Sequence, residues 1–311
     1  MRRACGALIA LAALAGGLFA AYEWGLVRVN YPSYTEFPVR GIDVSRYQGT
    51  IDWAAVAASG VSFAFIKATE GGDHRDPRFA ENWAGAANAN VLRGAYHFFT
   101  FCTPGALQAA NLIAVVPVEP SALPPAIDVE FAGNCRRWES IETIRRELDV
   151  FLGLVERAYG RRPIIYFTRE SYERVLDGRL AGYATWARSL FGRPRSRFGA
   201  WAFWQYAHNG RVPGIDGLVD LNVFQGSPSA LPALRGQGSN GPMSRLEGGH
   251  PYSRVTEGNS SKLAYSAPRA SGRRLQGFCS ASALPCTRPT CRPSRAFVRP
   301  LQLRRAARAD G

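Results

Sequence analysis

Two acids separated by one residue, Asp128 and Glu130, end the apolar run PPAIDVE. Side chains at positions i and i+2 of an extended strand point to the same face, so both carboxyls are expected to meet one ligand. Like charges this close disfavour double ionisation, which raises the proton affinity of one carboxyl and suits it to general-acid catalysis near neutral pH. A DxE pair alone is also compatible with a solvated strand end or a metal site.

Two further acids, Asp43 in GIDVSRYQG and Asp220 in VDLNVF, lie in the first and last apolar runs of the same region. The first and last strands of a closed barrel are neighbours, which would bring these acids beside Asp128 and Glu130. We expect the four carboxyls to share one barrel mouth and to be catalytic, with no metal or organic cofactor. The alternatives are that Asp43 caps a turn, that Asp220 binds loop amides, and that the cluster holds a divalent cation.

Aromatic residues near the ends of the same strands suit a sugar ligand, because pyranose rings present apolar CH faces that pack on flat rings. The candidates for substrate binding are Tyr96, Phe98, Tyr166, Trp204 and Tyr206. Strand alternation sends Trp204 and Gln205 to opposite faces, so only some of these rings can face the cleft, and core packing is the alternative for each. His97 follows Tyr96 directly and is expected to point into a helix layer.

These residues need elements that place them together, and the chain from Val39 onward alternates short apolar runs with amphipathic stretches. Strands are predicted at 41–45, 62–68, 92–99, 124–130, 163–168, 183–189, 200–207 and 218–224. Helices are predicted at 52–59, 78–89, 105–116, 140–159 and 169–176. The last three strands follow one another too closely for crossover helices. The prediction is an α/β fold, an irregular TIM-like β-α barrel with about five β-α units followed by closely spaced strands.

Six ordered motifs resemble those of glycoside hydrolase family 25 over roughly residues 39–227. They are GIDVSRYQG with IDW after it, FAFIKATEG, RGAYHFF, PPAIDVE, WQYA and VDLNVF. The resemblance implies an irregular β-α barrel with N-acetylmuramidase activity, which cuts the β-1,4 bond between N-acetylmuramic acid and N-acetylglucosamine in peptidoglycan glycan strands. It also implies that Glu130 is the general acid, Asp128 its partner, and Asp43 and Asp220 the flanking carboxylates. The alternatives are a wall-binding module without turnover and a chitinase-like hydrolase.

The two ends of the chain lie outside this resemblance. Met1-Arg2-Arg3 and the uncharged run that follows are typical of an export signal or of an uncleaved membrane anchor. We therefore predict four segments: 1–22 signal or anchor, 23–38 linker, 39–227 hydrolase domain, and 228–311 a basic, disordered tail. The tail is either a wall-tethering segment or the product of an aberrant reading frame. The enzyme is expected to be an extracytoplasmic monomer that meets the membrane only through its N-terminal segment.

The formal charge of +14 belongs mostly to the tail. Residues 232–311 hold 14 Lys and Arg against 3 Asp and Glu, which leaves 24 against 21 for the rest of the chain. The domain itself is nearly neutral, which argues against a nucleic-acid-binding surface.

Six cysteines are present, and two of them, Cys102 and Cys135, lie within the predicted domain on either side of one helical stretch. Export permits disulfides, so we predict that these two are paired. The alternative is two buried free thiols, whereas metal binding lacks any CxxC or HxxxH context. Cys5 lies in the signal, and the three tail cysteines, Cys279, Cys286 and Cys291, define no framework.

Overall fold

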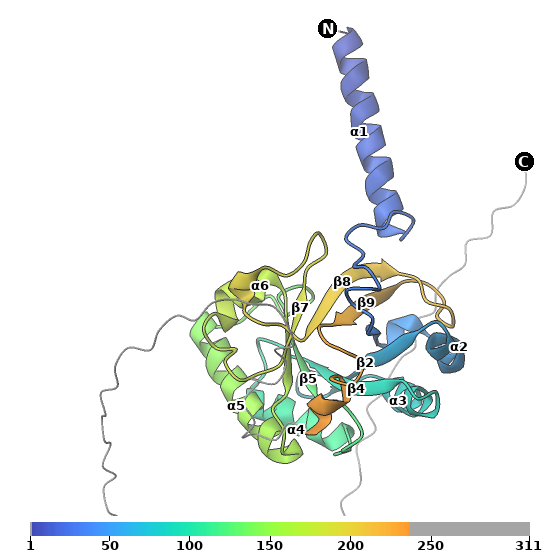
Figure 1. Cartoon of the computed structure of the whole chain (residues 1–311). Coiled ribbons are helices and arrows are strands. Elements are labelled where there is room, and N and C mark those ends of the chain that lie inside the picture. Colours follow the sequence, from blue (N-terminus) through green and yellow to red (C-terminus); the bar gives the residue numbers. More distant parts are fainter. Residues whose placement is uncertain (1, 237–311) are drawn as a thin grey trace, which may run out of the picture. The chain divides into compact units, whose positions relative to one another are not determined.

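The computed structural model describes residues 2–236 of the chain (Figure 1). Its strands are β1 (Arg40–Val44), β2 (Val61–Glu70), β3 (His74–Arg75), β4 (Leu92–Phe98), β5 (Ala126–Val129), β6 (Ile164–Phe167), β7 (Thr185–Arg188), β8 (Phe203–Gly210) and β9 (Val219–Phe224). Its α-helices are α1 (Arg2–Glu23), α2 (Trp53–Ala58), α3 (Phe79–Asn88), α4 (Gly105–Val115), α5 (Ile141–Tyr159) and α6 (Arg169–Ser171), which continues as a π-helical turn, Tyr172–Leu176.

Eight of these strands close into a barrel. The order around the sheet is β1-β9-β8-β7-β6-β5-β4-β2, and a parallel pairing of β1 with β2 completes the ring. β3 lies outside the ring as an antiparallel partner of the end of β2. Each of the eight predicted strands is present, and the prediction of an irregular TIM-like α/β barrel is confirmed.

The irregularity lies where the predicted crossover helices run out. β9 runs antiparallel to both of its neighbours, β8 and β1, whereas the other pairs around the barrel are parallel. Only a short 3-10 turn, Ser196–Phe198, lies between β7 and β8. Figure 1 shows α3, α4 and α5 beside the parallel strands. The carboxyl ends of the parallel strands therefore open at one mouth.

Residues before β1 pack on the barrel wall beside β8, where a helix would lie in a regular barrel. Phe37 is buried against Trp201 and Trp204, with ring centroids 5.9 and 5.8 Å apart. Tyr31 packs edge-on against Tyr206 at 5.2 Å. Part of the predicted 23–38 linker thus belongs to the packed structure, because its aromatic side chains cover the outward-facing residues of β8.

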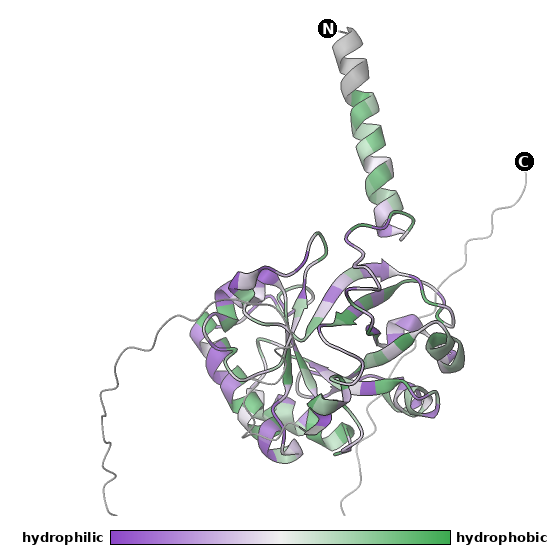
Figure 2. Cartoon of the chain, in the orientation of Figure 1, coloured by the Kyte–Doolittle hydropathy of each residue, from purple (hydrophilic) through white to green (hydrophobic). Residues whose placement is uncertain are grey.

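Buried side chains form two clusters on either side of the sheet, as alternation requires. The cluster inside the barrel is rich in aromatic rings, including Phe63, Phe65, Trp186 and Phe203. The other cluster fills the space between the strands and the helices. Figure 2 shows the corresponding concentration of hydrophobic residues along the strands and the polar outer faces of the helices. Gly41 is required here, since a Cβ would lie 2.3 Å from the Phe63 ring.

The packed structure extends beyond residue 227, the predicted end of the hydrolase domain. Leu231 and Leu234 are only 4% and 2% exposed and join the cluster inside the barrel. Arg161 donates a hydrogen bond to the Arg235 carbonyl at 3.1 Å, which ties this segment to the residues before β6. The barrel therefore includes the chain to at least Gly236, while the rest of the predicted tail lies outside the described residues.

Cys102 and Cys135 form a disulfide in the structure, with Cα atoms 6.3 Å apart. The two residues follow β4 and β5, so the bridge links two loops at the barrel mouth. Cys5 lies within α1, whereas the tail cysteines lie outside the described residues.

The prediction of a membrane anchor is not supported by α1 or by any other described helix. None within residues 2–236 combines the length and the apolar character needed to cross a bilayer.

Candidate active site

The structure brings the four predicted acids together at the barrel mouth. Asp43 and Asp220 are directly paired residues of β1 and β9. Asp128 lies near the end of β5, and Glu130 follows that strand. All four carboxyls line one pocket of about 190 Å³. Val129, between the two acids of the DxE motif, points the other way into the helix layer, as alternation predicts.

Asp43 is held by a network of buried side chains. Gln205 Nε2 and Asn222 Nδ2 donate hydrogen bonds to its Oδ2 at 3.0 and 2.7 Å. Tyr166 Oη in turn donates to Gln205 Oε1 at 2.9 Å, and Trp186 Nε1 donates to Asn222 Oδ1 at 2.8 Å. These outer donors fix both amides with their N–H groups toward Asp43, so the carboxyl is kept in one orientation as an acceptor.

Burial raises the pKa of every acid in the cluster. It raises the pKa of Asp43 to about 6, although the hydrogen bonds from Asn222 and Gln205 act in the opposite direction. Burial and the charge of Asp43 raise the pKa of Asp220 well above its usual range. Burial therefore favours the protonated form of Asp220, so the pair carries less negative charge than two exposed carboxylates would.

Asp128 and Glu130 differ in their surroundings. Burial, followed by the charges of Glu130 and Asp43, raises the pKa of Asp128 well above its usual range. Its Oδ1 atom is buried without a hydrogen-bond partner among the described residues. Burial raises the pKa of Glu130 to about 6, against an opposing effect of Arg188. The site therefore contains an acid that is protonated in mildly acidic solution and a buried oxygen that is free to bind a ligand.

The acid pocket is the middle part of a longer groove. On the β1 and β2 side it adjoins a pocket of about 360 Å³, which shares the four acids and reaches Tyr47 and Lys67. On the β6 and β7 side it adjoins a third pocket of about 500 Å³, which shares Ala132 and Arg188 with it. An open groove across the acids can admit a chain-like ligand rather than a single small molecule.

Three of the five predicted aromatic residues lie in this groove. Tyr96 and Tyr166 line the acid pocket, and Phe98 lines the adjoining pocket, with Lys67 Nζ 5.1 Å from its ring centre. Tyr166 is buried and Tyr96 is half-buried, and desolvation of each phenol raises its pKa well above its usual range. Both hydroxyls therefore remain hydrogen-bond donors at any working pH.

Trp204 and Tyr206, the other two aromatic residues predicted to bind substrate, do not line the groove. Both point out of the barrel, since Gln205 between them points in. Trp204 Nε1 donates to the Ser189 carbonyl at 2.9 Å within the outer core.

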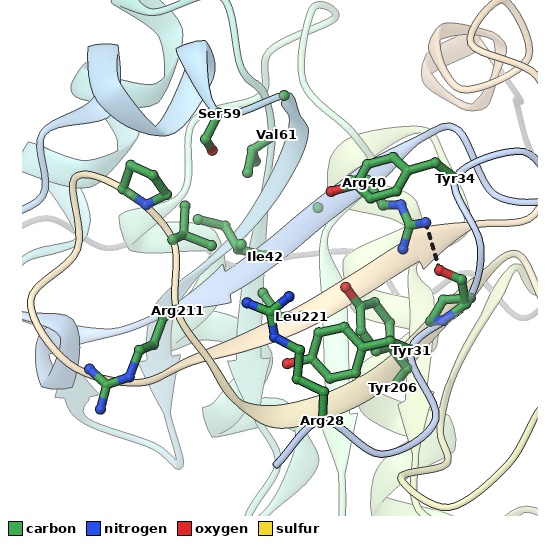
Figure 3. A pocket seen from close by; sticks show the side chains of 15 residues that line it. Arg28, Tyr31, Tyr34, Arg40, Ile42, Ser59, Val61, Tyr206, Arg211 and Leu221 are labelled. Carbon is green, nitrogen blue, oxygen red and sulfur yellow. Dashed lines mark hydrogen bonds between the residues drawn. The ribbon is translucent and has the colours of Figure 1, made fainter. Parts of the chain in front are cut away.

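Tyr206 lines a separate pocket of about 580 Å³ on the outer wall (Figure 3). No acid is among its described lining residues. Arg40 donates to the Pro32 carbonyl at 2.8 Å and lies 4.0 Å from the centre of the Tyr34 ring. These contacts attach residues 31–34 to β1, so this pocket is a seam between the N-terminal segment and the barrel.

His97 packs between the barrel and α4, as predicted. Its Nδ1 lies 2.8 Å from Thr69 Oγ1 and its Nε2 lies 3.1 Å from Gln108 Oε1. Burial lowers its pKa to about 4, so it is neutral and structural.

Sequence reasoning missed four residues around the acids: Trp186, Arg188, Gln205 and Asn222. Trp186 and Arg188 alternate along β7 in the way that Asp128 and Glu130 alternate at the end of β5. The alternation of Trp186 and Arg188 is visible in the sequence TWAR. It points to the active site only once β7 is known to lie beside β6. Among the described residues, no set of three or more His, Cys, Asp or Glu side chains is arranged to hold a metal ion.

Comparison with known proteins agrees with this geometry. The sequence profile of Glycosyl hydrolases family 25 matches residues 42–215. Lysozyme M1 of Streptomyces globisporus is 35% identical over 210 residues, which cover 63% of this chain and 71% of its own length. An uncharacterized Escherichia coli K12 protein, YegX, is 39% identical over 65% of this chain and 74% of its own length.

A solved structure of a family 25 glycosyl hydrolase from Bacillus anthracis has 36% sequence identity and a TM-score of 0.63. It covers 68% of this chain and 98% of its own. A bacterial lysozyme from Streptomyces coelicolor has 34% identity and a TM-score of 0.59, and covers 63% and 96%. The profile match and the shared barrel together establish that this chain belongs to glycosyl hydrolase family 25.

Proposed function

We propose that this glycoside hydrolase is a lysozyme that cuts the β-1,4 bond between N-acetylmuramic acid and N-acetylglucosamine in peptidoglycan. The observation that carries the proposal is the groove across the barrel mouth, with four acids in its middle pocket. The sequence relatives include lysozymes and two N,O-diacetylmuramidases, from Chalaropsis and Arthroderma benhamiae.

In the proposed reaction, Glu130 protonates the leaving glycosidic oxygen while an oxocarbenium-like transition state develops. Its raised pKa of about 6 supports this role, because the carboxyl keeps its proton in mildly acidic solution. The unpartnered Oδ1 of Asp128 suits an N–H donor of the substrate, such as the 2-acetamido group. Asp128 then orients that group as an internal nucleophile; positioning of a water for direct displacement is the alternative.

The experiment that tests the proposal is digestion of purified peptidoglycan followed by mass spectrometry of the new reducing ends. N-acetylmuramic acid ends support it, and N-acetylglucosamine ends would reject it. The rival chitinase-like activity predicts cleavage of chitin oligosaccharides instead. A wall-binding module without turnover predicts binding to sacculi and no new ends.

We also propose that the enzyme works outside the cytoplasm, with residues 1–22 as its export signal. The mouth disulfide is compatible with an oxidising compartment.

A further inference from the structure

The third pocket of the groove has an unusual charge. Its lining includes five arginines and a single acid, Glu170; the arginines are Arg169, Arg188, Arg193, Arg195 and Arg197. We call this pocket the arginine groove. It is formed by the segments that follow β6 and β7, so it opens on the same mouth as the acids.

The arginines of this groove are not all neutralised within the protein. Arg169 and Arg197 share one partner, Glu173, and Arg193 pairs with Glu36. Neither Arg188 nor Arg195 has an ion-pair partner within residues 2–236. Arg195 therefore remains available to an anionic ligand, whereas Arg188 faces both this groove and the acids of the neighbouring pocket. Guanidinium is the side-chain group best matched to a carboxylate.

The groove also offers an apolar contact. Phe191 is 78% exposed and lines the same pocket. Aromatic residues and arginine are both enriched in the interfaces at which proteins bind other polypeptides. Arg188 and Ala132 border both this pocket and the acid pocket, so a ligand that fills the arginine groove continues directly to Glu130.

We propose that the arginine groove binds the carboxylates of the peptide stem carried by the N-acetylmuramic acid unit beside the scissile bond. This inference rests on the proposed function. A bare glycan has one carboxylate on the lactyl group of each N-acetylmuramic acid. The stem converts this carboxylate into an amide bond, brings several carboxylates of its own, and leaves from the same sugar ring that is being cut. The stem must therefore exit the cleft within a few bonds of the acids, next to the arginine groove in which Arg195 has no ion-pair partner among residues 2–236.

The test compares soluble uncrosslinked glycan strands that carry native stems with the same strands after conversion of the stem carboxylates to primary amides. Arg195→Gln removes a groove charge that does not border the acid pocket. Arg157→Gln is the matched control, because Arg157 is exposed on the last turn of α5, just before β6 begins at the opposite end of the barrel.

For the parent enzyme we expect amidation of the stems to raise KM about threefold to tenfold with kcat unchanged, the size of an exposed but localised charge interaction. Arg195→Gln should raise KM to a similar extent on native strands and have no further effect on amidated strands. The control should behave as the parent does. High ionic strength should reduce the difference between the two substrates.

Equal effects of Arg195→Gln on both substrates, or a parent that does not distinguish them, would overturn the inference. Failure of the proposed function is recognised separately, by calorimetric binding of the two strand preparations to the Glu130→Gln protein. Stem-charge-dependent binding without turnover by the parent would support the groove and reject the lysozyme proposal. Stem-independent binding would reject the groove whatever the turnover.

Discussion

Glu130 and Asp43 have pKa values raised to a similar level, about 6, yet their surroundings suit them to different tasks. Asp43 accepts two amide hydrogen bonds and is fixed by them. The Glu130 carboxyl accepts no hydrogen bond from the described residues. Asn134 Nδ2 donates only to the backbone carbonyl of Glu130. A fixed carboxyl can orient a substrate or its neighbours, whereas proton donation needs a carboxyl whose oxygen is free to approach the leaving group.

Replacement of Glu130 by Gln should reduce kcat by at least about a hundredfold, since general-acid catalysis contributes on this order. The amide keeps the shape of the side chain but cannot donate the required proton. Turnover of peptidoglycan and binding of glycan strands are measured on the same preparation, with binding expected to stay within about threefold of the parent. Activity within about tenfold of the parent would remove Glu130 from this role.

Arg188 sets the pH range in which the acids work. Its positive charge lowers the pKa of Glu130 and of the three neighbouring acids, against the effect of burial. Arg188→Gln should therefore raise these pKa values and shift the pH profile of kcat to higher pH. The basic limb is the informative one, because it reports loss of the proton that Glu130 donates. Arg188→Lys keeps the charge and should retain most of the parental profile; an unshifted profile for the Gln variant would contradict this account.

Glu130 also links stability to pH. Its pKa is raised in the folded state from 4.5 to about 6, so the folded protein holds this proton more tightly than the unfolded chain does. The stabilisation that this tighter proton binding adds to the folded state is present below about pH 4.5 and is lost as pH rises through about 6. Relative to the parent, Glu130→Gln should gain about 1 to 2 kcal/mol in unfolding free energy between these pH values. Urea unfolding at pH 4 and pH 7 measures the change, and a pH-independent difference would reject the linkage.

At the scale of elements, apolar runs and their spacing were sufficient to predict the eight barrel strands and the placement of the acids near strand ends. The facing of individual side chains was harder. In β8 the three residues Trp204, Gln205 and Tyr206 alternate as expected, but the choice of which face is inside depends on pairing with β7 and β9. Register is fixed by contacts between distant residues, which a single strand sequence does not contain.

The same dependence explains why the amide network around Asp43 was missed. Gln205 and Asn222 are paired across β8 and β9, and both reach Asp43 on β1. Each amide is unremarkable in its own strand, and only the closure of the barrel places them side by side. The signal that sequence does carry is the acid itself, because a buried carboxylate requires donors from somewhere.

The disulfide joins two loops at the barrel mouth. Its loss should lower the free energy of unfolding and leave kcat nearly unchanged. Removal of the bridge by Cys102→Ser with Cys135→Ser should lower the unfolding free energy by about 3 to 4 kcal/mol in the chain-entropy model. Neither cysteine lines the acid pocket, so kcat of the folded variant should stay near the parental value. Urea unfolding under oxidising and reducing conditions provides the measurement. Free-thiol labelling of both residues in native exported protein would contradict the pairing.

At the scale of the whole molecule, most of the net positive charge lies in the chain that follows the packed barrel. Residues 237–311 contain 13 Lys and Arg against 3 Asp and Glu, whereas the preceding chain is close to balance. The groove acids and aromatic rings all precede residue 225. Attraction of the basic segment to the carboxylates of intact sacculi is therefore expected to raise the local enzyme concentration without changing the chemistry.

Two truncations distinguish the basic segment from the packed end of the barrel. A chain that ends at Gly236 should cleave soluble glycan fragments at the parental rate, and should lose activity on intact sacculi at low ionic strength but not at high ionic strength.

A chain that ends at Ser227 also removes Leu231 and Leu234, whose side chains are 4% and 2% exposed inside the barrel. Loss of two such side chains should cost about 4 kcal/mol or more in unfolding free energy. Thermal unfolding and turnover of the soluble substrate are measured for both chains. A chain ending at Gly236 that is folded but inactive on soluble fragments would mean that residues beyond the barrel complete the active site. A chain ending at Ser227 that is as stable as the longer one would mean that Leu231 and Leu234 do not belong to the barrel core.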